Sequence, residues 1–329
     1  MTLILGAVWG YSIHKNHVFP YAQIGSVKLW LNPTVKTKTK SWPDSAIDIE
    51  THPGHRAYFV KSTQNAPAPL IVDLHPWNES YSNDQYALVY QVLEKNWNYI
   101  HPDFGGPNDN PKACCSDFAM NDIDLSIDYA IKEASVDTNK IIVLGVSGGG
   151  YATLQYSLKT RHKIHQFQAW CPISNLIDFY YQPKGAYGCI SEDILKCTGS
   201  TREKLNLIEC KRRSPLYVLK EQNFNVLNLN MQIFVGVKDP IISITQSVEY
   251  YNELVKKMGT EYFKSLVSDK ELLEMMNLKE NALRHSNDNL LDGQRIVLEK
   301  KVNGIRLVVF TGGHDLLKPQ AIHEIEKSF

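Results

Sequence analysis

Residues 140–151 read Lys-Ile-Ile-Val-Leu-Gly-Val-Ser-Gly-Gly-Gly-Tyr, an apolar run that breaks into a glycine-rich turn around Ser147. The segment Ile141–Leu144 is short, uncharged and rich in β-branched residues, which is typical of a central strand buried on both faces. Apolar residues at helical spacing follow from Tyr151, so the stretch predicts a strand, a sharp turn and a helix. The turn matches the G-x-S-x-G elbow, whose strained backbone projects a serine hydroxyl above a sheet. We therefore expect Ser147 to be a nucleophile.

The composition limits the classes of function. A chain of 329 residues can hold one large α/β domain or two modest ones. Lys and Arg number 35, as do Asp and Glu, so the formal net charge is zero. Such a chain has no basic field that would hold a nucleic acid, and a small or neutral substrate fits its charge better than a polyanion.

The cysteines do not form a recognisable metal-binding pattern. None of the six lies in a C-x-x-C pair, and the chain lacks H-E-x-x-H, so we predict no metal and no organic cofactor. Cys171 lies in an apolar run and reads as a small buried residue. Cys189, Cys197 and Cys210 fall in a loop-rich insert, where disulfides form if the protein is exported. The sequence leaves their pairing open.

The N-terminal stretch Met1–Ile13 is largely apolar and carries no charged side chain. It is too short to span a bilayer, which needs about 20 residues, and it lacks the basic start and cleavage site of a signal peptide. Three interpretations stay open: the remnant of a membrane anchor, a poor signal-anchor, or a first strand. The location of the protein is therefore open: it is either exported or membrane-anchored, or it is cytoplasmic. If the protein associates with a membrane, we expect it to do so through this stretch.

Strands and helices alternate through most of the chain. This alternation predicts an α/β fold with a mostly parallel central sheet covered by helices on both faces. We divide the chain into an N-terminal segment with edge strands, 1–64, and a main domain, 65–329, with a cap inserted at about 173–228 and a second insertion near 260–295. The expected strands are 55–61, 69–75, 97–101, 141–144, 166–171, 231–236, 295–301 and 305–310, and the longer expected helices are 86–93, 117–134 and 244–258.

A serine hydroxyl needs a base within hydrogen-bond reach, and the base needs an orienting acid. Asp239 follows the second strand after the elbow and is the candidate acid, although an aspartate near a helix start is also favoured for local reasons. His314 follows the last strand after two glycines, which suits a tight loop that delivers an imidazole. We therefore predict that Ser147, Asp239 and His314 form a catalytic triad.

Acyl-group hydrolysis also needs hydrogen-bond donors for the developing oxyanion. The backbone N–H of Gly148 is one candidate. The second should come from the loop after strand 69–75, where Pro76 has no N–H, so we assign it to Trp77, with Asn78 as the alternative. In the same loop we expect His75 to brace the backbone by hydrogen bonding rather than to transfer protons.

Two further residues are placed near the substrate by their position. Asp103 belongs to the segment 99–107, which leaves another strand at the same edge of the sheet. This segment either shapes the acyl or leaving-group pocket or is a structural turn. We assign His75, Asp103 and Tyr151 to the surroundings of the substrate.

The motifs together resemble the α/β-hydrolase superfamily, and within it the catalytic domain of the prolyl oligopeptidase-like serine hydrolases, over about residues 65–325. The resemblance rests on Leu74-His-Pro-Trp, the elbow with its upstream Val136-Asp, Arg213-Ser-Pro215, Gly236-Val-Lys-Asp239 and Gly312-Gly-His314. It implies an α/β-hydrolase fold with a cap insertion, and it matches Ser147, Asp239 and His314 to the family's triad.

The chain departs from the family's pattern in two places. The oxyanion loop has Pro76 and Trp77 where the family usually has glycines, and the stretch between Asp239 and His314 is unusually long. The residues before 65 are also too few for the β-propeller of the oligopeptidases. We therefore expect a serine esterase that removes an O-acyl group from a saccharide or polysaccharide, similar to single-domain carbohydrate acetyl esterases. The alternatives are a propeller-free peptidase and a binding or scaffold protein that keeps the triad.

Overall fold

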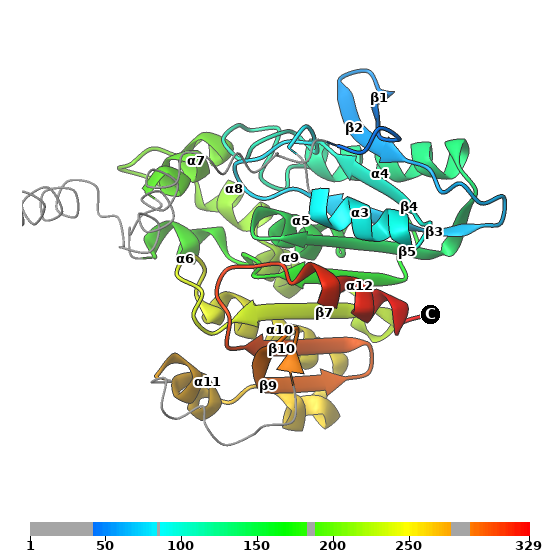
Figure 1. Cartoon of the computed structure of the whole chain (residues 1–329). Coiled ribbons are helices and arrows are strands. Elements are labelled where there is room, and N and C mark those ends of the chain that lie inside the picture. The colour runs from blue at the N-terminus through cyan, green and yellow to red at the C-terminus, as the bar shows by residue number, and fades with distance from the viewer. Residues whose placement is uncertain (1–41, 84–85, 183–187, 278–289) are drawn as a thin grey trace, which may run out of the picture.

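The computed structural model describes residues 42–83, 86–182, 188–277 and 290–329 (Figure 1). The apolar stretch Met1–Ile13, with its three open interpretations, lies outside the described residues. The described strands form one 10-stranded sheet in the order β1-β2-β4-β3-β5-β6-β7-β10-β9-β8. The strand numbering jumps across the sheet because helices cross over between parallel neighbours. The sheet therefore has the mixed, mostly parallel topology that the alternation of elements predicts.

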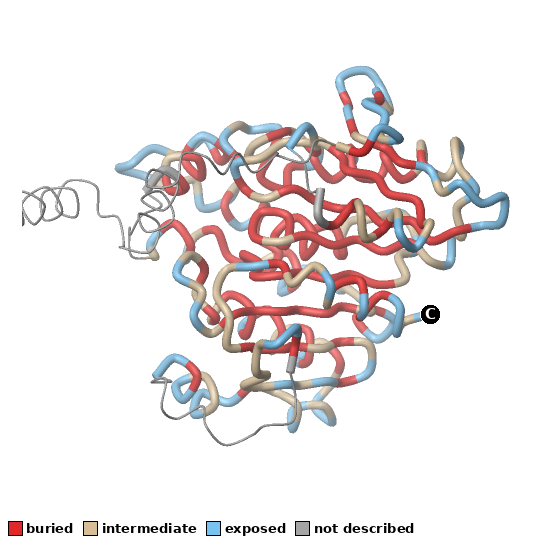
Figure 2. The backbone as a smooth tube through the Cα atoms, viewed as in Figure 1, coloured by how far each residue is buried: buried red, intermediate tan, exposed pale blue. Residues whose placement is uncertain are grey.

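Six neighbouring strands form the parallel centre of the sheet. Every residue of β3 and β7 is buried, and Figure 2 shows the same burial through the middle of the molecule. Burial on both faces explains why these strands appear in the sequence as continuous apolar runs. The expected strands agree with the observed ones to within a few residues. The observed bounds are β3 (Ala68–Leu74), β4 (Asn98–Pro102), β5 (Val136–Val146), β6 (Gln166–Trp170), β7 (Met231–Gly236) and β10 (Ile305–Phe310).

Antiparallel strands complete both edges of the sheet. At one edge, β1 (Ile47–His52) pairs with β2 (His55–Val60), and β2 pairs antiparallel with β4. At the other edge, β9 (Gln294–Val302) forms a hairpin with β10, and the short β8 (Leu290–Leu291) pairs with β9. The strand predicted at 55–61 is β2, and it belongs to the same sheet as the rest of the chain together with β1, which was not among the expected strands.

Helices cover the sheet on both faces. Along β5, Ile142 packs with one set of helices and Val143 with the other, because successive side chains of a strand point to opposite faces. The helices α3 (Tyr86–Glu94) and α12 (Lys318–Glu326) lie in front of the sheet in Figure 1 and pack together. The opposite face is covered by α4 (Asp117–Glu133), α5 (Gly148–Tyr156) and α10 (Ile244–Met258).

The expected cap at 173–228 is helical where the structure describes it. Its elements are α6 (Leu176–Tyr181), α7 (Gly188–Thr198), α8 (Leu207–Arg212), α9 (Pro215–Glu221) and the 3-10 turn η1 (Val226–Asn228). The helices α6, α7 and α8 lie together at one end of the molecule in Figure 1. This end holds the carboxyl ends of the parallel strands, where loops carry functional residues in folds of this class.

A disulfide joins the cap to the body of the molecule. Cys197 on α7 is bonded to Cys114 in the segment before α4. The sequence suggests bridges among the cysteines of the insert, but the partner of Cys197 comes from outside the insert because the tertiary fold brings α7 against that segment. Cys171 and Cys210 are free and buried, as is Cys115.

The second insertion, near 260–295, is only partly described. It contains η2 (Thr260–Ser265), the helix α11 (Asp269–Met276) and β8, and residues 278–289 lie outside the described residues. Within the described part of the chain, no helix is both long and apolar enough to cross a lipid bilayer.

Candidate active site

Ser147 lies at the sharp turn between β5 and α5. Its backbone has φ 58° and ψ −118°, a left-handed conformation that non-glycine residues rarely adopt, and this strain is the feature that the elbow motif predicts. The Ser147 N–H donates to the carbonyl of Trp170 on β6 at 2.9 Å, and its own carbonyl accepts from Tyr151 at 2.8 Å. The serine is thereby held above the carboxyl ends of the central strands.

Asp239 and His314 form a direct pair. Asp239 follows β7 and His314 follows β10, and the Nδ1 atom of the imidazole lies 2.8 Å from Oδ2 of the carboxylate. The other carboxylate oxygen accepts the N–H groups of Ile241 and Ile242 at 2.8 and 2.9 Å. The Asp239 side chain is 1% exposed, so its orientation is fixed by three contacts in a nearly dry environment.

A small cavity brings the serine and the histidine together. It has a volume of about 210 Å³, and Ser147 and His314 both line it, with Pro76 from the oxyanion loop. Ser147 Oγ and the His314 ring do not form a hydrogen bond in this structure, and catalytic hydrogen bonds commonly tighten only when substrate binds. The wall is completed by Val146, Asp315, Leu316 and Lys318. Sequence analysis did not single out Leu316 and Lys318, although they lie only two and four residues after His314.

The structure places both predicted oxyanion donors beside each other. Gly148 and Trp77 approach so closely that a Cβ atom built on Gly148 would lie 2.5 Å from the Trp77 backbone nitrogen. Gly148 begins α5, and the first N–H groups of a helix have no partner within the helix. Among the described residues, none accepts a hydrogen bond from the Trp77 backbone N–H. Two free N–H groups therefore stand next to Ser147, which is the arrangement that an oxyanion requires.

The residues assigned to the surroundings of the substrate lie behind the cavity rather than in its wall. His75 is fully buried, stacks on Phe104, and contacts the carbonyl of Pro76 through Nδ1 and that of Asp103 through Nε2, at 2.9 Å each. Burial lowers the pKa of His75, so the neutral ring donates through one nitrogen only. These contacts show His75 connecting the oxyanion loop to the segment after β4. Asp103 is half-buried, and its carboxylate accepts the N–H of Tyr81.

Tyr151 connects the elbow helix to the base of the cap. Its side chain is fully buried, and its hydroxyl donates to the carbonyl of Arg213 at 2.6 Å and contacts that of Cys114 at 3.1 Å. The Arg213 guanidinium in turn donates to the carbonyls of Ala113 and Cys114. Tyr151 therefore contacts the supports of the site and does not line the cavity.

The aromatic residues of α6, and Trp170 at the end of β6, are mostly core residues. Trp170 is fully buried and stacks on Phe234 at 4.0 Å, and Phe179 and Tyr180 are buried in the cap. Only Tyr181 of this group is exposed, with 69% of its surface accessible. Trp170 is buried on the α12 side of the sheet, whereas Phe179 and Tyr180 belong to the core on the opposite face.

A buried polar network beneath the oxyanion loop was not recognisable from the sequence. The Tyr99 hydroxyl donates to Asp73 at 2.6 Å, and the His101 ring lies 2.7 Å from the Asp73 carbonyl. Burial raises the pKa of Asp73 to about 7, and burial lowers that of His101 to about 3. These side chains belong to apolar strand runs, so only the folded sheet brings them together.

One group of described residues has the composition of a metal site. Cys171, Asp239 and His314 bring a thiol sulfur, a carboxylate oxygen and an imidazole nitrogen within 4.8 Å of one another. Two of the three are already paired with each other in the Asp239–His314 contact. Burial and the neighbouring Asp239 carboxylate raise the pKa of the Cys171 thiol, which favours the protonated form that binds metals poorly.

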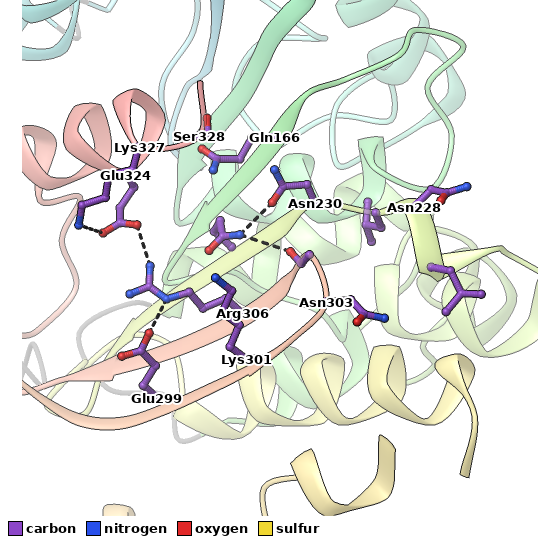
Figure 3. Close-up of a pocket in the computed structure, with 14 residues that line it drawn as sticks. Gln166, Asn228, Asn230, Glu299, Lys301, Asn303, Arg306, Glu324, Lys327 and Ser328 are labelled. Carbon is purple, nitrogen blue, oxygen red and sulfur yellow. Dashed lines mark hydrogen bonds and ion pairs between the residues drawn. The ribbon is translucent and has the colours of Figure 1, made fainter. Parts of the chain in front are cut away.

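A second, larger cleft of about 560 Å³ lies at the opposite end of the strands, where β6, β7 and β10 begin (Figure 3). Arg306 crosses it and pairs with Glu299 at 2.7 Å and Glu324 at 2.8 Å. Its described lining contains no histidine or cysteine, and its charges are largely paired. Residues that could activate a nucleophile therefore line the cavity around Ser147, and the described lining of this second cleft has none.

Comparison with known proteins identifies a serine-hydrolase family whose match includes the elbow at Ser147. Residues 115–271 match the model of the prolyl oligopeptidase family. The chain has the α/β-hydrolase fold, and it is similar to this family over the matched residues. No curated protein sequence matches the chain.

Solved structures show the same fold as this chain. An acylaminoacyl peptidase of Pyrococcus horikoshii is 16% identical with a TM-score of 0.53, and the match covers 69% of this chain and 37% of that chain. A puromycin-hydrolysing peptidase of Mycobacterium tuberculosis is 16% identical with a TM-score of 0.52, covering 64% and 33%. Dipeptidyl peptidase 4 of Porphyromonas gingivalis is 17% identical with a TM-score of 0.51, covering 66% and 31%. The chain thus spans about a third of the length of these proteins.

Proposed function

We propose that this α/β-hydrolase cleaves small carboxylic esters through an acyl-enzyme. The observation that carries the proposal is the Asp239–His314 pair at 2.8 Å, facing the same cavity as Ser147 on its strained turn. A structural role alone would not require a serine in the left-handed region beside two free N–H groups. The prolyl oligopeptidase match over residues 115–271 includes Ser147 and Asp239 and supports a serine-hydrolase site there, while His314 lies beyond the matched residues.

We assign each residue a role in two half-reactions. His314 removes the proton from Ser147 as Oγ attacks the ester carbonyl, and Asp239 keeps the imidazole in the tautomer that accepts this proton. The N–H groups of Gly148 and Trp77 stabilise the oxyanion. His314 then protonates the departing alcohol, and water repeats the sequence to release the carboxylic acid and the free serine.

The size of the cavity supports a short acyl group. At about 210 Å³ it is smaller than the roughly 300–1,000 Å³ of most sites for drug-sized ligands. An acetyl group fits this space with its carbonyl at Ser147, whereas the alcohol would extend past Leu316 and Lys318 toward solvent. A saccharide alcohol stays part of the proposal.

Peptide hydrolysis is the second candidate function, because the similar structures are named peptidases. The small cavity favours the ester over a peptide. A binding or scaffold role is the third candidate function. If the protein has this role, Ser147 should be chemically unreactive.

The test measures hydrolysis of p-nitrophenyl acetate and labelling by a fluorophosphonate, with Ser147→Ala as the control. We expect turnover and labelling in the natural chain, and a loss of turnover on the order of 10⁴-fold in the variant. Absence of Ser147-dependent labelling would sink the hydrolase proposal. Comparing an acetylated saccharide with an aminoacyl p-nitroanilide then separates the candidates, because a preference for the anilide would favour the peptidase.

A further inference from the structure

The indole of Trp77 is bonded to the cap. Trp77 is 3% exposed, and its Nε1 atom donates to Oδ2 of Asp193 on α7 at 3.3 Å within a buried region. Phe179 of α6 contacts the same ring edge-on, at 6.0 Å between centroids. The residue that offers its backbone N–H beside Gly148 is therefore held through its side chain by the cap.

The backbone of Trp77 is connected to the same helix by a second route. Its carbonyl accepts the N–H of Asn108 at 2.8 Å, and the Asn108 side chain accepts the N–H of Cys114 at 2.6 Å. Cys114 is bonded by the disulfide to Cys197 on α7. The route therefore starts at Trp77 and ends on the cap helix.

The two routes meet on one face of α7. Asp193 and Cys197 are four residues apart, a spacing that places side chains next to each other along a helix. This face therefore contacts Trp77 through its ring and, via Asn108, through its carbonyl. Glu192 points elsewhere, since it is exposed and pairs with Arg202 at 2.9 Å. A displacement of α7 would consequently move the Trp77 N–H relative to Gly148.

We propose that Asp193 is a positioning residue for the oxyanion hole, which acts by holding the Trp77 indole so that the backbone N–H of Trp77 faces the reacting carbonyl. The inference rests on the proposed function. It connects the cap to the chemical step, because α7 holds the second oxyanion donor in place through Asp193. Because the oxyanion exists only after Oγ attacks, the Asp193–Trp77 contact should raise kcat and hardly change KM.

The experiment compares Asp193→Ala, Asp193→Asn and Glu192→Ala, using p-nitrophenyl acetate and a trifluoromethyl ketone that forms a hemiketal with the serine. Loss of a whole oxyanion donor costs about 10²–10³-fold in rate, so we expect loss of its positioning to lower kcat by about tenfold or more in Asp193→Ala. KM should stay within about twofold, and the ketone should bind more weakly by a similar factor. Asp193→Asn keeps an acceptor oxygen and should stay close to the natural chain, as should Glu192→Ala.

Trp77→Phe provides a second variant, because it removes the same hydrogen bond from the other side without altering the backbone N–H. It should lower kcat as Asp193→Ala does, and adding Asp193→Ala to it should cause no further loss. Thermal melting checks that each variant is folded. The inference is overturned if Trp77→Phe and Asp193→Ala both keep the natural kcat, if Asn fails to rescue, or if KM alone changes. An inactive natural chain would instead overturn the proposed function and this inference together.

Discussion

At the residue scale, Asp239 is the most constrained member of the site. One carboxylate oxygen accepts two backbone N–H groups while the other faces His314 Nδ1, so the side chain has no freedom to turn. The neighbouring Asp315 lines the cavity but is adjacent to His314 in the chain, and it cannot approach the ring from the far side. We therefore propose Asp239, and not Asp315, as the residue that orients the imidazole.

Replacing Asp239 by asparagine should lower kcat on the order of 10⁴-fold with little change in KM. The amide offers an N–H group where the imidazole N–H needs an acceptor, so it stabilises the wrong tautomer. Steady-state kinetics with p-nitrophenyl acetate measures the loss, and Asp315→Asn is the matched control. A greater loss in Asp315→Asn would assign the orienting role to Asp315 instead.

Gly149→Ala should destabilise the fold by about 3 kcal/mol or more. A Cβ atom at this position would lie 1.9 Å from the carbonyl oxygen of Leu74, a contact with backbone that cannot move aside. Gly293→Ala is the control, because its φ of 77° is unfavourable for alanine but the surrounding space is open, at a cost of about 1–2 kcal/mol. Urea unfolding compares the two. Equal midpoints would show that the elbow tolerates a side chain here.

At the element scale, the junction between the cap and α10 depends on one side chain. Gln246 on α10 is buried, and its Oε1 atom accepts the N–H groups of Ser174 and Asn175 at 2.8 Å each. Its Nε2 atom donates to the Asn175 carbonyl at 3.3 Å. The amide thus forms hydrogen bonds with the backbone groups where the chain leaves β6 and enters the cap. Among the described residues, no backbone carbonyl of a helix or a sheet accepts these two N–H groups.

Gln246→Leu should lower the free energy of unfolding by about 3 kcal/mol. The substitution keeps the volume but leaves two buried N–H groups without acceptors, each costing about 1–3 kcal/mol. Glu249→Leu on the exposed side of α10 is the matched control and should stay within about 0.5 kcal/mol. The explanation fails if chemical denaturation gives the two variants the same stability.

At the scale of the whole molecule, the buried network around His101 makes stability depend on pH. The pKa of His101 falls from 6.5 to about 3 on burial, so the unfolded chain binds the proton first as the pH decreases. Its contribution to stability is complete above pH 6.5 and is lost as the pH falls toward 3. Asp73 acts oppositely, because its raised pKa of about 7 makes the folded chain bind a proton first.

His101→Gln should therefore become more stable relative to the natural chain as the pH decreases below 6.5, by up to about 1.4 kcal/mol per pH unit. The Asp73 contribution is present in both proteins and cancels in the difference. Urea unfolding from pH 7 to pH 4 measures this difference. A difference that does not vary with pH would show that His101 titrates normally in the folded chain.

The central sheet could be predicted because its physical cause is local in the sequence. A strand buried on both faces must be apolar along its length, as β3 and β7 are, and crossover helices separate such runs at regular intervals. The cap was harder. Its short helices carry no strong period, and the burial of Trp170 and Phe179 depends on which surface they meet.

The sequence by itself determined the order of strands and helices, the elbow at Ser147, and the positions of Asp239 and His314 after their strands. Each of these features follows from a short-range pattern, and loops at the carboxyl ends of parallel strands converge. Only the tertiary structure decided what surrounds that site. The Cys114–Cys197 bridge, the Trp77–Asp193 contact and the size of the cavity join segments far apart in the chain. Such contacts depend on packing between surfaces, which leaves no period or motif in either segment alone.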